Sequence, residues 1–487
     1  MLFNSYIFIF AFLPISFFIY FYLTQKKLIV ASKIFLVFSS LFFYAWWNVI
    51  YLPIIMLSIV FNYLIGRELH TYGLNHESKL KKKLLLTFGI TSNVALLGYF
   101  KYSDFFIENY NLAVNSDVGL LHLALPLAIS FFTFQQISYL VDSYRSDIKE
   151  YDFLNYALFV TFFPQLIAGP IVHHKEMMPQ FAKVRNKVKN YRNITMGLFI
   201  FAMGLFKKVV IADTFAVWAT TGFDTATTLN LLEAWITSLS YTFQLYFDFS
   251  GYTDMAIGAA LLFNIKLPIN FNSPYKATDI QDFWRRWHIT LGRFLKDYVY
   301  IPLGGNRKGE FRTYQNLLAT FVLAGIWHGA GWSFLLWGFL HGLALVIHRA
   351  WSTLGLKLWT WVAWLITFNF INATWVFFRA KEWDDAMKVL NGMVDFNTLV
   401  LPIFFETKLT MFKEYIEFGG FLPNIQGSYN TVAWILGGFV LILFFKNSME
   451  KLKAFKPTFS HALLFVILFV ISFYKLSGYS EFLYFRF

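Results

Sequence analysis

Long apolar runs separated by short polar segments dominate the chain. The first run, Met1 to Leu23, has no basic segment before it and no small-residue cleavage site, which favours a retained first span over a cleaved signal peptide. Thirteen further runs of spanning or near-spanning length lie at residues 34–47, 52–65, 84–100, 120–140, 154–171, 194–211, 231–246, 255–267, 317–329, 332–347, 359–378, 431–445 and 462–474. Because about 20 apolar residues in a helix cross a bilayer, the pattern predicts an all-α polytopic membrane protein with about ten to thirteen crossings.

Composition supports this class and narrows the available chemistry. Of the 487 residues, 57% are hydrophobic and 14% charged, and the 61 Phe, 27 Tyr and 16 Trp are too many to hide inside one water-facing globule. A bilayer accepts such a surface and places Trp and Tyr at its two interfaces. The chain has no cysteine, which excludes disulfides, thiolate metal sites and a cysteine nucleophile. Catalysis would have to use histidine, carboxylate, hydroxyl or a bound cofactor.

The net charge of +13 comes from basic clusters in the loops. Lys26-Lys27, residues 79–83 and residues 183–192 all lie between apolar runs, which is typical of cytoplasmic loops and argues against nucleic-acid binding. Residues 67–83 and 173–192 are therefore both expected in the cytoplasm. The acidic segment 142–152 is expected outside.

Three apolar runs separate the two basic segments, although an even number of crossings is needed to put both on one side. We therefore expect residues 120–140, which contain Pro126 and the pair Gln135-Gln136, to dip into the membrane and return without crossing. Such backbone is tolerated at membrane depth where protein buries it or where it lines a cavity.

Two carboxylates stand among aromatic residues at 246–254. Asp248 and Asp254 lie on either side of Gly251, which predicts a helix break or tight bend between them. Carboxylates at membrane depth usually face the protein interior, where they pair with Arg, His or backbone groups. The residues alone favour a structural ion pair or helix cap over a catalytic role.

A second polar cluster occupies residues 282–292. On a continuous helix Trp284 and His288 share one face, while Asp282 and Arg286 share another as an ion pair. This arrangement predicts a neutral His288 against an aromatic wall. A histidine between tryptophans can equally be an interfacial anchor.

A third cluster surrounds His328, which lies between Gly325, Gly329 and Gly331. These glycines remove side-chain bulk and allow another backbone or a thin acyl chain to approach. A neutral imidazole suits removal of a proton from a hydroxyl nucleophile at neutral pH. The alternative is a hydrogen-bonded core histidine with glycines that serve helix packing. His341 follows one helical turn after Trp337 and belongs either to the same cavity or to packing.

The remaining polar motifs are weaker. Residues 301–308 form a basic turn that suits phosphate groups, although loop topology explains the same charges. His70, His76, His173 and His174 lie in basic loops and are expected to be solvated. No histidine spacing suggests a metal cage.

Three ordered stretches together carry a family resemblance. YFDFSGYTDMAIG, FWRRWHITLGRFLKDYVYIPLGGNRKG and GIWHGAGWSFLLWGFLHG resemble the membrane-bound O-acyltransferase family, in particular its bacterial branch typified by the alginate O-acetyltransferase membrane subunit. The opening MLFNSYIFIF and FPQLIAGPI also match, so the resemblance covers essentially residues 1–487 as one domain, with its motif core at 241–348. It implies a helical barrel of about eleven transmembrane helices plus re-entrant helices around a central tunnel.

The resemblance also implies roles for individual residues. His328 of the WHG motif and His288 of the RRWH motif become the expected catalytic pair, with no metal. The expected orienting or tunnel-lining residues are Asp248, Tyr252, Asp254, Trp284, Trp327, Trp332 and His341, and Asp248 is a candidate to orient a histidine. The expected contacts for the phosphates of acetyl-CoA are Arg285, Arg286, Arg293, Lys296 and Arg307.

The implied reaction moves an acetyl group from cytosolic acetyl-CoA across the bacterial inner membrane to an outer acceptor hydroxyl. The implied partner is an SGNH-hydrolase-like protein that acetylates a polysaccharide such as alginate, cellulose, another exopolysaccharide or peptidoglycan. Membrane lipid is an expected contact and nucleic acid is not. A teichoic-acid D-alanyl transferase remains the main alternative, followed by a glycan or lipid transporter and by a non-catalytic scaffold.

Overall fold

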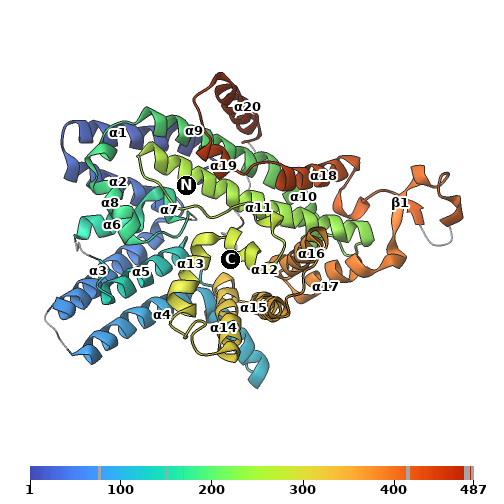
Figure 1. The fold of residues 1–487 in the computed structure, drawn as a ribbon, viewed down its shortest axis with the longest axis horizontal. Helices are drawn as coiled ribbons and strands as arrows, with labels where there is room; N and C mark the ends of the chain where they lie inside the picture. Colours follow the sequence, from blue (N-terminus) through green and yellow to red (C-terminus); the bar gives the residue numbers. More distant parts are fainter. Residues whose placement is uncertain (75–77, 149–151, 168, 413–416, 477–482, 484–487) are drawn as a thin grey trace.

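The computed structural model describes residues 1–74, 78–148, 152–167, 169–412, 417–476 and 483. Its N-terminal half is a series of helices and helical turns (Figure 1). In chain order they are η1 (Phe8–Phe12), α1 (Leu13–Gln25), α2 (Ile29–Ala45), η2 (Val49–Tyr51), α3 (Leu52–Leu74), α4 (Lys79–Val114), α5 (Ile129–Tyr144), α6 (Phe153–Thr161), α7 (Phe163–Leu166), α8 (His174–Ala182), η3 (Val184–Lys187), α9 (Tyr191–Phe206), η4 (Lys207–Ala212), α10 (Asp213–Thr220), η5 (Thr221–Thr225) and α11 (Leu231–Leu262).

The C-terminal half adds more helices and a small excursion that projects from the body of the molecule near β1 (Figure 1). Its elements are η6 (Pro274–Lys276), α12 (Ile280–Arg286), α13 (Ile289–Leu295), η7 (Lys296–Tyr300), α14 (Glu310–His328), α15 (Trp332–Thr353), α16 (Thr360–Arg379), α17 (Trp383–Val394), η8 (Phe396–Thr398), β1 (Val400–Pro402), η9 (Ile403–Phe405), η10 (Thr410–Phe412), β2 (Glu417–Gly419), η11 (Pro423–Ile425), α18 (Tyr429–Phe444), α19 (Ser448–Lys453) and α20 (Phe459–Lys475). The two short strands pair in parallel.

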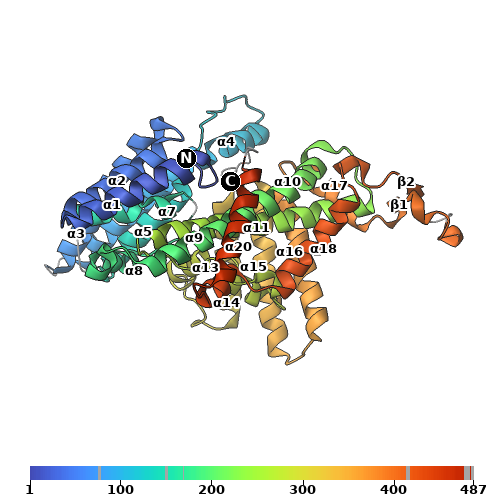
Figure 2. The ribbon, with the colours of Figure 1, turned by 90° about the horizontal axis from the view of Figure 1, so that it is seen from above.

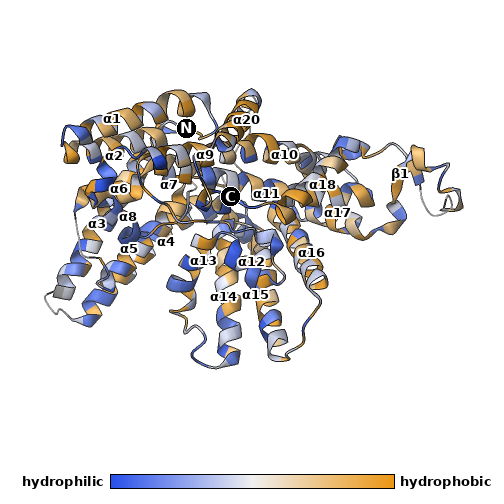
Figure 3. Cartoon of the chain, turned by 45° about the horizontal axis from the view of Figure 1, so that its top comes forward, coloured by the Kyte–Doolittle hydropathy of each residue, from blue (hydrophilic) through white to orange (hydrophobic). Residues whose placement is uncertain are grey.

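Six continuous helical segments are long and apolar enough to cross a membrane. They cover Phe8–Gln25, Val49–Gly73, Lys79–Val114, Tyr191–Thr225, Trp332–Thr353 and Thr360–Arg379. Shorter apolar helices are α2, α18 and α20. Apolar residues cover much of α1 and α20, while polar residues gather at helix ends and loops (Figure 3). The predicted all-α, membrane-integral class is confirmed.

One end of the helix bundle collects the basic segments, and we call it the basic end. Lys82 near the start of α4 lies 5.2 Å from the ring centre of Tyr144 at the end of α5. Lys175 on α8 forms an ion pair of 3.3 Å with Asp147. The start of α4, the end of α5 and α8 therefore lie at the same end.

This arrangement contradicts two of our topological predictions. Segment 142–148 lies at the basic end and not opposite to it, because Asp147 pairs with Lys175 there. Residues 120–144 run the length of α3: the Tyr51 hydroxyl bonds the carbonyl of Ala124 at one end, and Tyr144 lies at the other. Helix α6 has nine residues, about 14 Å, and is therefore too short to cross a hydrocarbon core of about 30 Å by itself.

Helix α11 runs through the centre of the molecule against α9 (Figures 1 and 2). It is continuous through Gly251, so the predicted break between Asp248 and Asp254 is wrong. A methyl group at Gly251 would lie 2.8 Å from the carbonyl oxygen of Gly204 on α9, and one at Gly258 would lie 2.6 Å from that of Gly197. Gly251 therefore serves close helix packing and does not bend the chain.

Helices α14 and α15 form a tight antiparallel pair after the basic turn 301–309. A methyl group at Gly325 would lie 3.1 Å from the Cα of Gly338 on α15. Gly325 and Gly338 therefore allow close contact between α14 and α15, as the packing alternative expected. This contact holds the C-terminal end of α14 against α15, so that His328 lies beside α15.

Candidate active site

Three histidines that are far apart in sequence meet in one buried aromatic cluster. His288, His328 and His341 are 1%, 5% and 0% exposed. Trp327 lies between the first two, with ring centres 6.4 Å from His288 and 4.8 Å from His328. Trp337 lies between the last two, 5.1 Å from His328 and 4.8 Å from His341. The predicted pair His288 and His328 therefore shares one site with His341.

His328 is the last residue of α14, and two side chains from α4 hold that helix end. The ammonium group of Lys101 donates to the carbonyl oxygens of Trp327 and His328, at 2.7 and 2.8 Å. The hydroxyl of Tyr102 donates to the carbonyl of Ile326. A cation at a helix C-terminus satisfies carbonyls that have no partner inside the helix and matches the negative end of the dipole.

Sequence reasoning missed Lys101 and Tyr102. Both lie in a long apolar helix more than two hundred residues before the carbonyls that they bind. The available signal was a lysine directly after the predicted span 84–100, because a charge close to membrane depth usually has a specific partner.

His288 lies in a turn between two short helices, and not on the continuous helix that we predicted. Helix α12 ends at Arg286, and His288 has a left-handed backbone with φ of 43° before α13 begins. Asn270 holds this turn: its backbone carbonyl accepts from the amide of Ile289, and its side-chain oxygen accepts from the hydroxyl of Thr290 at 2.6 Å. The predicted ion pair between Asp282 and Arg286 is present at 2.9 Å.

The surroundings of His288 keep it neutral, as expected. Its ring lies 4.8 Å from that of Phe249 on α11, edge to face. Burial lowers the pKa of His288 to about 3, because a charged imidazole would lose its hydration there. A neutral ring can accept or donate a hydrogen bond without adding a cation to the site.

His341 has polar partners on both of its ring nitrogens. The indole nitrogen of Trp284 lies 3.3 Å from Nδ1, and the hydroxyl of Thr374 on α16 lies 3.0 Å from Nε2. Trp284 and His341 thus belong to the cluster, and their roles in orienting groups or lining a tunnel stay predictions. Phe378 on α16 closes the side next to His328, with ring centres 5.0 Å apart.

The predicted residues of α11 lie outside this cluster. Asp248 is bonded to Lys208 at 2.8 Å and to the backbone amide of Leu483 at 2.9 Å, and not to a histidine. Asp254 forms an ion pair of 2.7 Å with Lys207. Tyr252 stacks on Phe3, with ring centres 4.7 Å apart. The π-helical turn η4 presents both lysines to α11, so this region is a structural ion-pair set, as the residues alone favoured.

Trp332 also lies apart from the histidines. Its side chain is 61% exposed, and its indole nitrogen donates to the side chain of Asn109 on α4 at 3.0 Å. It ties the start of α15 to α4 at the end of the molecule opposite the basic end.

The five basic residues predicted for phosphate binding separate into two groups. Arg286 is paired with Asp282, Arg293 with Glu176 at 2.7 Å, and Arg285 is exposed. Lys296 and Arg307 instead line one cavity of about 440 Å³ at the basic end. We call it the donor cavity, after the acyl donor that the family resemblance implies for Lys296 and Arg307; its lining also includes Tyr300, Gly304, Gly305, Asn306, Leu345, His348 and Arg349.

The donor cavity and the histidine cluster both include residues of α15. Gly304 and Gly305 form its turn with φ of 117° and 56°, which favour glycine, and Asn316 holds the carbonyl of Gly305 at 2.8 Å. Leu345 and His348 on its wall lie on the helix that carries His341, about 6 and about 10 Å further along. Neither Lys296 nor Arg307 forms an ion pair within the described residues.

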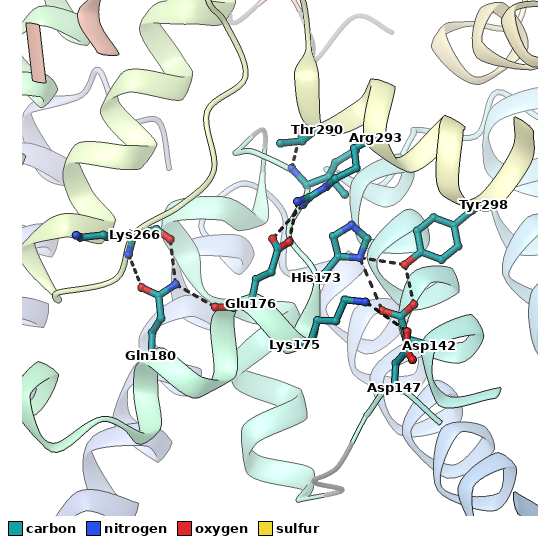
Figure 4. A network of polar contacts seen from close by, with 11 residues as sticks. Asp142, Asp147, His173, Lys175, Glu176, Gln180, Lys266, Thr290, Arg293 and Tyr298 are labelled. Carbon is teal, nitrogen blue, oxygen red and sulfur yellow. Dashed lines mark hydrogen bonds and ion pairs between the residues drawn. The ribbon is translucent and has the colours of Figure 1, made fainter. Parts of the chain in front are cut away.

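A second polar network fixes the wall next to the donor cavity (Figure 4). The hydroxyl of Tyr298 on η7 donates to Asp142 on α5 at 2.8 Å and lies 3.0 Å from Nδ1 of His173. Because η7 also carries Lys296 and Tyr300, this network anchors the turn that lines the cavity.

The expectation that the loop histidines are solvated is wrong for two of them. His173 and His174 are 4% and 6% exposed, because His173 packs against Asp142 and His174 against Tyr139, both on α5. Burial lowers the pKa of His174 to about 4, although the charge of Asp142 acts in the opposite direction. His70 is half-buried in α3, and His76 lies outside the described residues.

Comparison with known proteins identifies the family to which this constellation belongs. The pattern of MBOAT, the membrane-bound O-acyltransferase family, matches residues 1–381. The chain belongs to this family. It is therefore an acyltransferase, and His288, His328 and His341 lie in the motifs that carried the resemblance. No group of three or more His, Asp or Glu side chains in the described part of the chain is arranged to hold a metal ion.

Named relatives refine the placement within this family. A peptidoglycan O-acetyltransferase of Helicobacter pylori is 57% identical over 431 residues, which cover 82% of this chain and 81% of the relative. A probable alginate O-acetylase AlgI of Pseudomonas putida is 37% identical over 513 aligned residues, covering both chains in full. A teichoic acid D-alanyltransferase of Streptococcus thermophilus is 28% identical over 255 residues, or 49% of this chain. O-acetyltransferases are thus similar over far more of the chain than the D-alanyl enzyme is.

Proposed function

We propose that this protein moves an acetyl group from acetyl-CoA, bound at the basic end, to a hydroxyl presented at the opposite end, for O-acetylation of an extracytoplasmic polysaccharide. The observation that carries the proposal is the position of the donor cavity. It lies at the C-terminal end of α15, the helix that also carries His341 of the buried cluster. The bacterial inner membrane, about eleven crossings and a central tunnel form part of the proposal. The basic end would face the cytoplasm.

The donor cavity suits the phosphate-rich half of acetyl-CoA. Lys296 and Arg307 supply two cations for phosphate oxygens, and the glycine turn at 304–305 lets the backbone approach closely. Arg349 is already engaged by Glu310, at 2.7 and 2.8 Å, so it shapes the wall and adds less to binding. The thioester arm would extend along α15 toward the histidines.

His328 is the proposed general base. It would take the proton of the acceptor hydroxyl as that oxygen attacks the thioester carbonyl; the new C–O bond forms, the C–S bond breaks, and the proton passes to the leaving CoA sulfur. Lys101 fixes the backbone of His328, and the rings of Trp327, Trp337 and Phe378 exclude water from its side chain. Exclusion of water would limit hydrolysis of the thioester.

His288 is the proposed second histidine of the reaction. It is neutral and lies across Trp327 from His328, where it would orient the donor or the acceptor. The short helix α13 after it leads into η7, which carries Lys296 and Tyr300 of the donor cavity. Its left-handed backbone aims the ring into the cluster, which a continuous helix would not do.

The acceptor is proposed from the relatives. Peptidoglycan is the first candidate because the relative at 57% identity is named for it, and alginate is the second. An SGNH-hydrolase-like protein docked at the end opposite the basic end would receive the acetyl group and pass it to the glycan. Trp332 and the start of α15 lie at that end, next to α4.

The test is acetyl transfer in membrane vesicles that contain this protein with its outer partner. Labelled acetyl-CoA is supplied on the basic-end side, and both free CoA and label on peptidoglycan or alginate are measured. A D-alanyl carrier protein is supplied in a parallel reaction. We expect CoA release coupled to labelled glycan and no use of the D-alanyl donor. Glycan modification with D-alanine, or none with acetyl-CoA, would contradict the proposal.

A further inference from the structure

A second and larger cavity opens at the basic end, away from the donor cavity. It has a volume of about 790 Å³ and lies between α8, η3, the start of α9 and the turn after α11. Four cations line it: Lys183, Arg185, Arg192 and Lys266. Its one acidic residue, Glu176, is bound by both terminal nitrogens of Arg293, at 2.7 and 3.1 Å. The cavity is therefore strongly positive, and it shares no residue with the donor cavity.

Amide side chains build the wall of this cavity and bond to the surrounding chain. The Gln180 side chain accepts from the backbone amide of Lys266 at 2.8 Å and donates to its carbonyl at 3.0 Å (Figure 4). Asn193 donates to the side chain of Asn264 at 2.9 Å, and Asn264 donates to the carbonyls of residues 186 and 188. These bonds make a fixed frame. The four cations form no ion pair within the described residues, so their charge remains available.

An apolar groove begins where the cavity ends. It has a volume of about 310 Å³ and lies between α1, α9 and α20, with Phe10, Phe18, Leu198, Phe465 and Phe469 among its lining residues. Phe18 is 60% exposed and Leu198 42% exposed. Because this groove faces outward along candidate spans, it faces the hydrocarbon of the bilayer.

The same two elements form both the cavity and the groove. At the start of α9, Asn190, Arg192, Asn193 and Met196 line the basic cavity, whereas Ile194 and Leu198 line the groove. At the end of α11, Leu262 lines the groove, whereas Asn264 and Lys266 line the cavity. The cavity and the groove are therefore adjacent on both elements.

The rim of the cavity has the character of a membrane interface. Val184 and Tyr191 are 77% and 76% exposed and alternate with the basic residues of segment 183–192. The ammonium group of Lys189 lies 5.6 Å from the ring centre of Phe18 on α1. Exposed apolar residues interleaved with lysines are typical of chain that lies at the level of the lipid headgroups.

We infer that the cavity and groove form one binding site for an anionic glycerophospholipid of the leaflet at the basic end. The phosphate and its headgroup would lie among Lys183, Arg185, Arg192 and Lys266, and an acyl chain would lie against Phe18 and Leu198. Basic pockets between spanning helices on the cytoplasmic side favour such headgroups. This site is independent of the donor cavity and of the reaction proposed above.

The experiment measures lipid retention by the full-length protein. Purified protein in detergent is incubated with phosphatidylglycerol or phosphatidylcholine, and bound lipid is counted by native mass spectrometry across a concentration series. We expect phosphatidylglycerol to bind in preference to phosphatidylcholine. The triple variant Lys183→Gln, Arg185→Gln, Arg192→Gln should weaken phosphatidylglycerol binding about 100-fold. Each cation near the membrane surface raises the affinity for an anionic lipid about fivefold, and three such factors multiply to about 100.

Two controls separate this site from general charge and from the acyl donor. The matched variant Lys79→Gln, Lys83→Gln, Lys357→Gln removes three exposed lysines elsewhere and should bind phosphatidylglycerol as the wild type does. Leu198→Trp fills the groove, leaves every cation in place, and should also lose the lipid. Glycerol phosphate, which has no acyl chain, and free CoA should not displace it.

Equal phosphatidylglycerol binding by the wild type and the cavity triple variant would overturn the inference. Equal loss in the matched lysine variant would also overturn it, since it would show general attraction to a positive surface. Displacement by CoA at equal concentration would assign the cavity to the acyl donor instead. Retention of phosphatidylglycerol by Leu198→Trp would remove the groove from the site.

Discussion

Lys101 offers the sharpest test of how this fold positions His328, the proposed general base. Its ammonium group donates to the carbonyl oxygens of Trp327 and His328 at 2.7 and 2.8 Å. The substitution Lys101→Met keeps the length of the side chain and removes both bonds. The histidine side chain itself is unchanged, so any loss of activity reports on its position.

The size of the effect follows from these two bonds. A hydrogen bond from a charged group contributes about 1.5–3 kcal/mol. If the energy of one such bond is lost from the transition state, the turnover number falls about 10- to 160-fold. The KM for acetyl-CoA should stay unchanged, because Lys101 does not line the donor cavity.

The assay compares turnover of labelled acetyl-CoA by the wild type, Lys101→Met and Lys101→Arg at equal folded abundance. The arginine variant keeps a cation and should recover part of the activity. Lys33→Met is the matched control, because Lys33 is a half-buried lysine that bonds Asn155 at 2.6 Å away from the histidines. Wild-type turnover in Lys101→Met would refute the positioning argument, as would an equal loss in Lys33→Met.

Three further predictions concern the basic end. Arg307→Gln should raise the KM for acetyl-CoA about tenfold with little change in turnover number, since it removes one charged phosphate contact, whereas the exposed Arg312→Gln should change neither kinetic constant. Tyr298→Phe should raise the same KM a few-fold by loosening η7, and a double-mutant cycle with Asp142→Asn should show coupling between the two residues. His174 has a folded-state pKa of about 4, below its ordinary 6.5, so it stabilises the fold above about pH 6.5, and this stability is lost as the pH falls toward 4. Thermal melts from pH 7.5 to 4 should therefore fall less steeply for His174→Gln, and an unchanged slope would contradict this reading.

The sequence predicted the class of fold well because the apolar runs are long and the polar loops short. It located the spans around α1, α3, α4, α9, α15 and α16, each of which is long and apolar enough to cross. Prediction from the sequence was wrong where one residue pattern can arise from two different structural causes. Gly251 was interpreted as a bend, yet it lets α9 and α11 touch. The acidic segment 142–152 was placed outside, yet Asp147 is paired with a lysine at the basic end.

The site was predictable in part for a similar reason. His288, His328 and His341 each stand in a short aromatic motif, so their identity is visible locally, and the structure brings them together. The partners that position them come from distant segments: Asn270 holds the turn at His288, and Lys101 holds the end of α14. The carboxylates of α11 gave an equally strong local signal, but their lysines lie on η4, away from the histidines. Only three-dimensional packing separates these two cases.

The most direct test of the central claim is acetyl transfer by His328→Ala and His328→Gln in vesicles that contain the outer partner. Release of CoA and labelling of glycan should both fall by at least about 1000-fold, since general base catalysis and correct orientation are lost together. Phosphatidylglycerol binding and folded abundance should stay at wild-type levels. Glycan labelling at the wild-type rate in either variant would remove His328 from the chemistry and contradict the account.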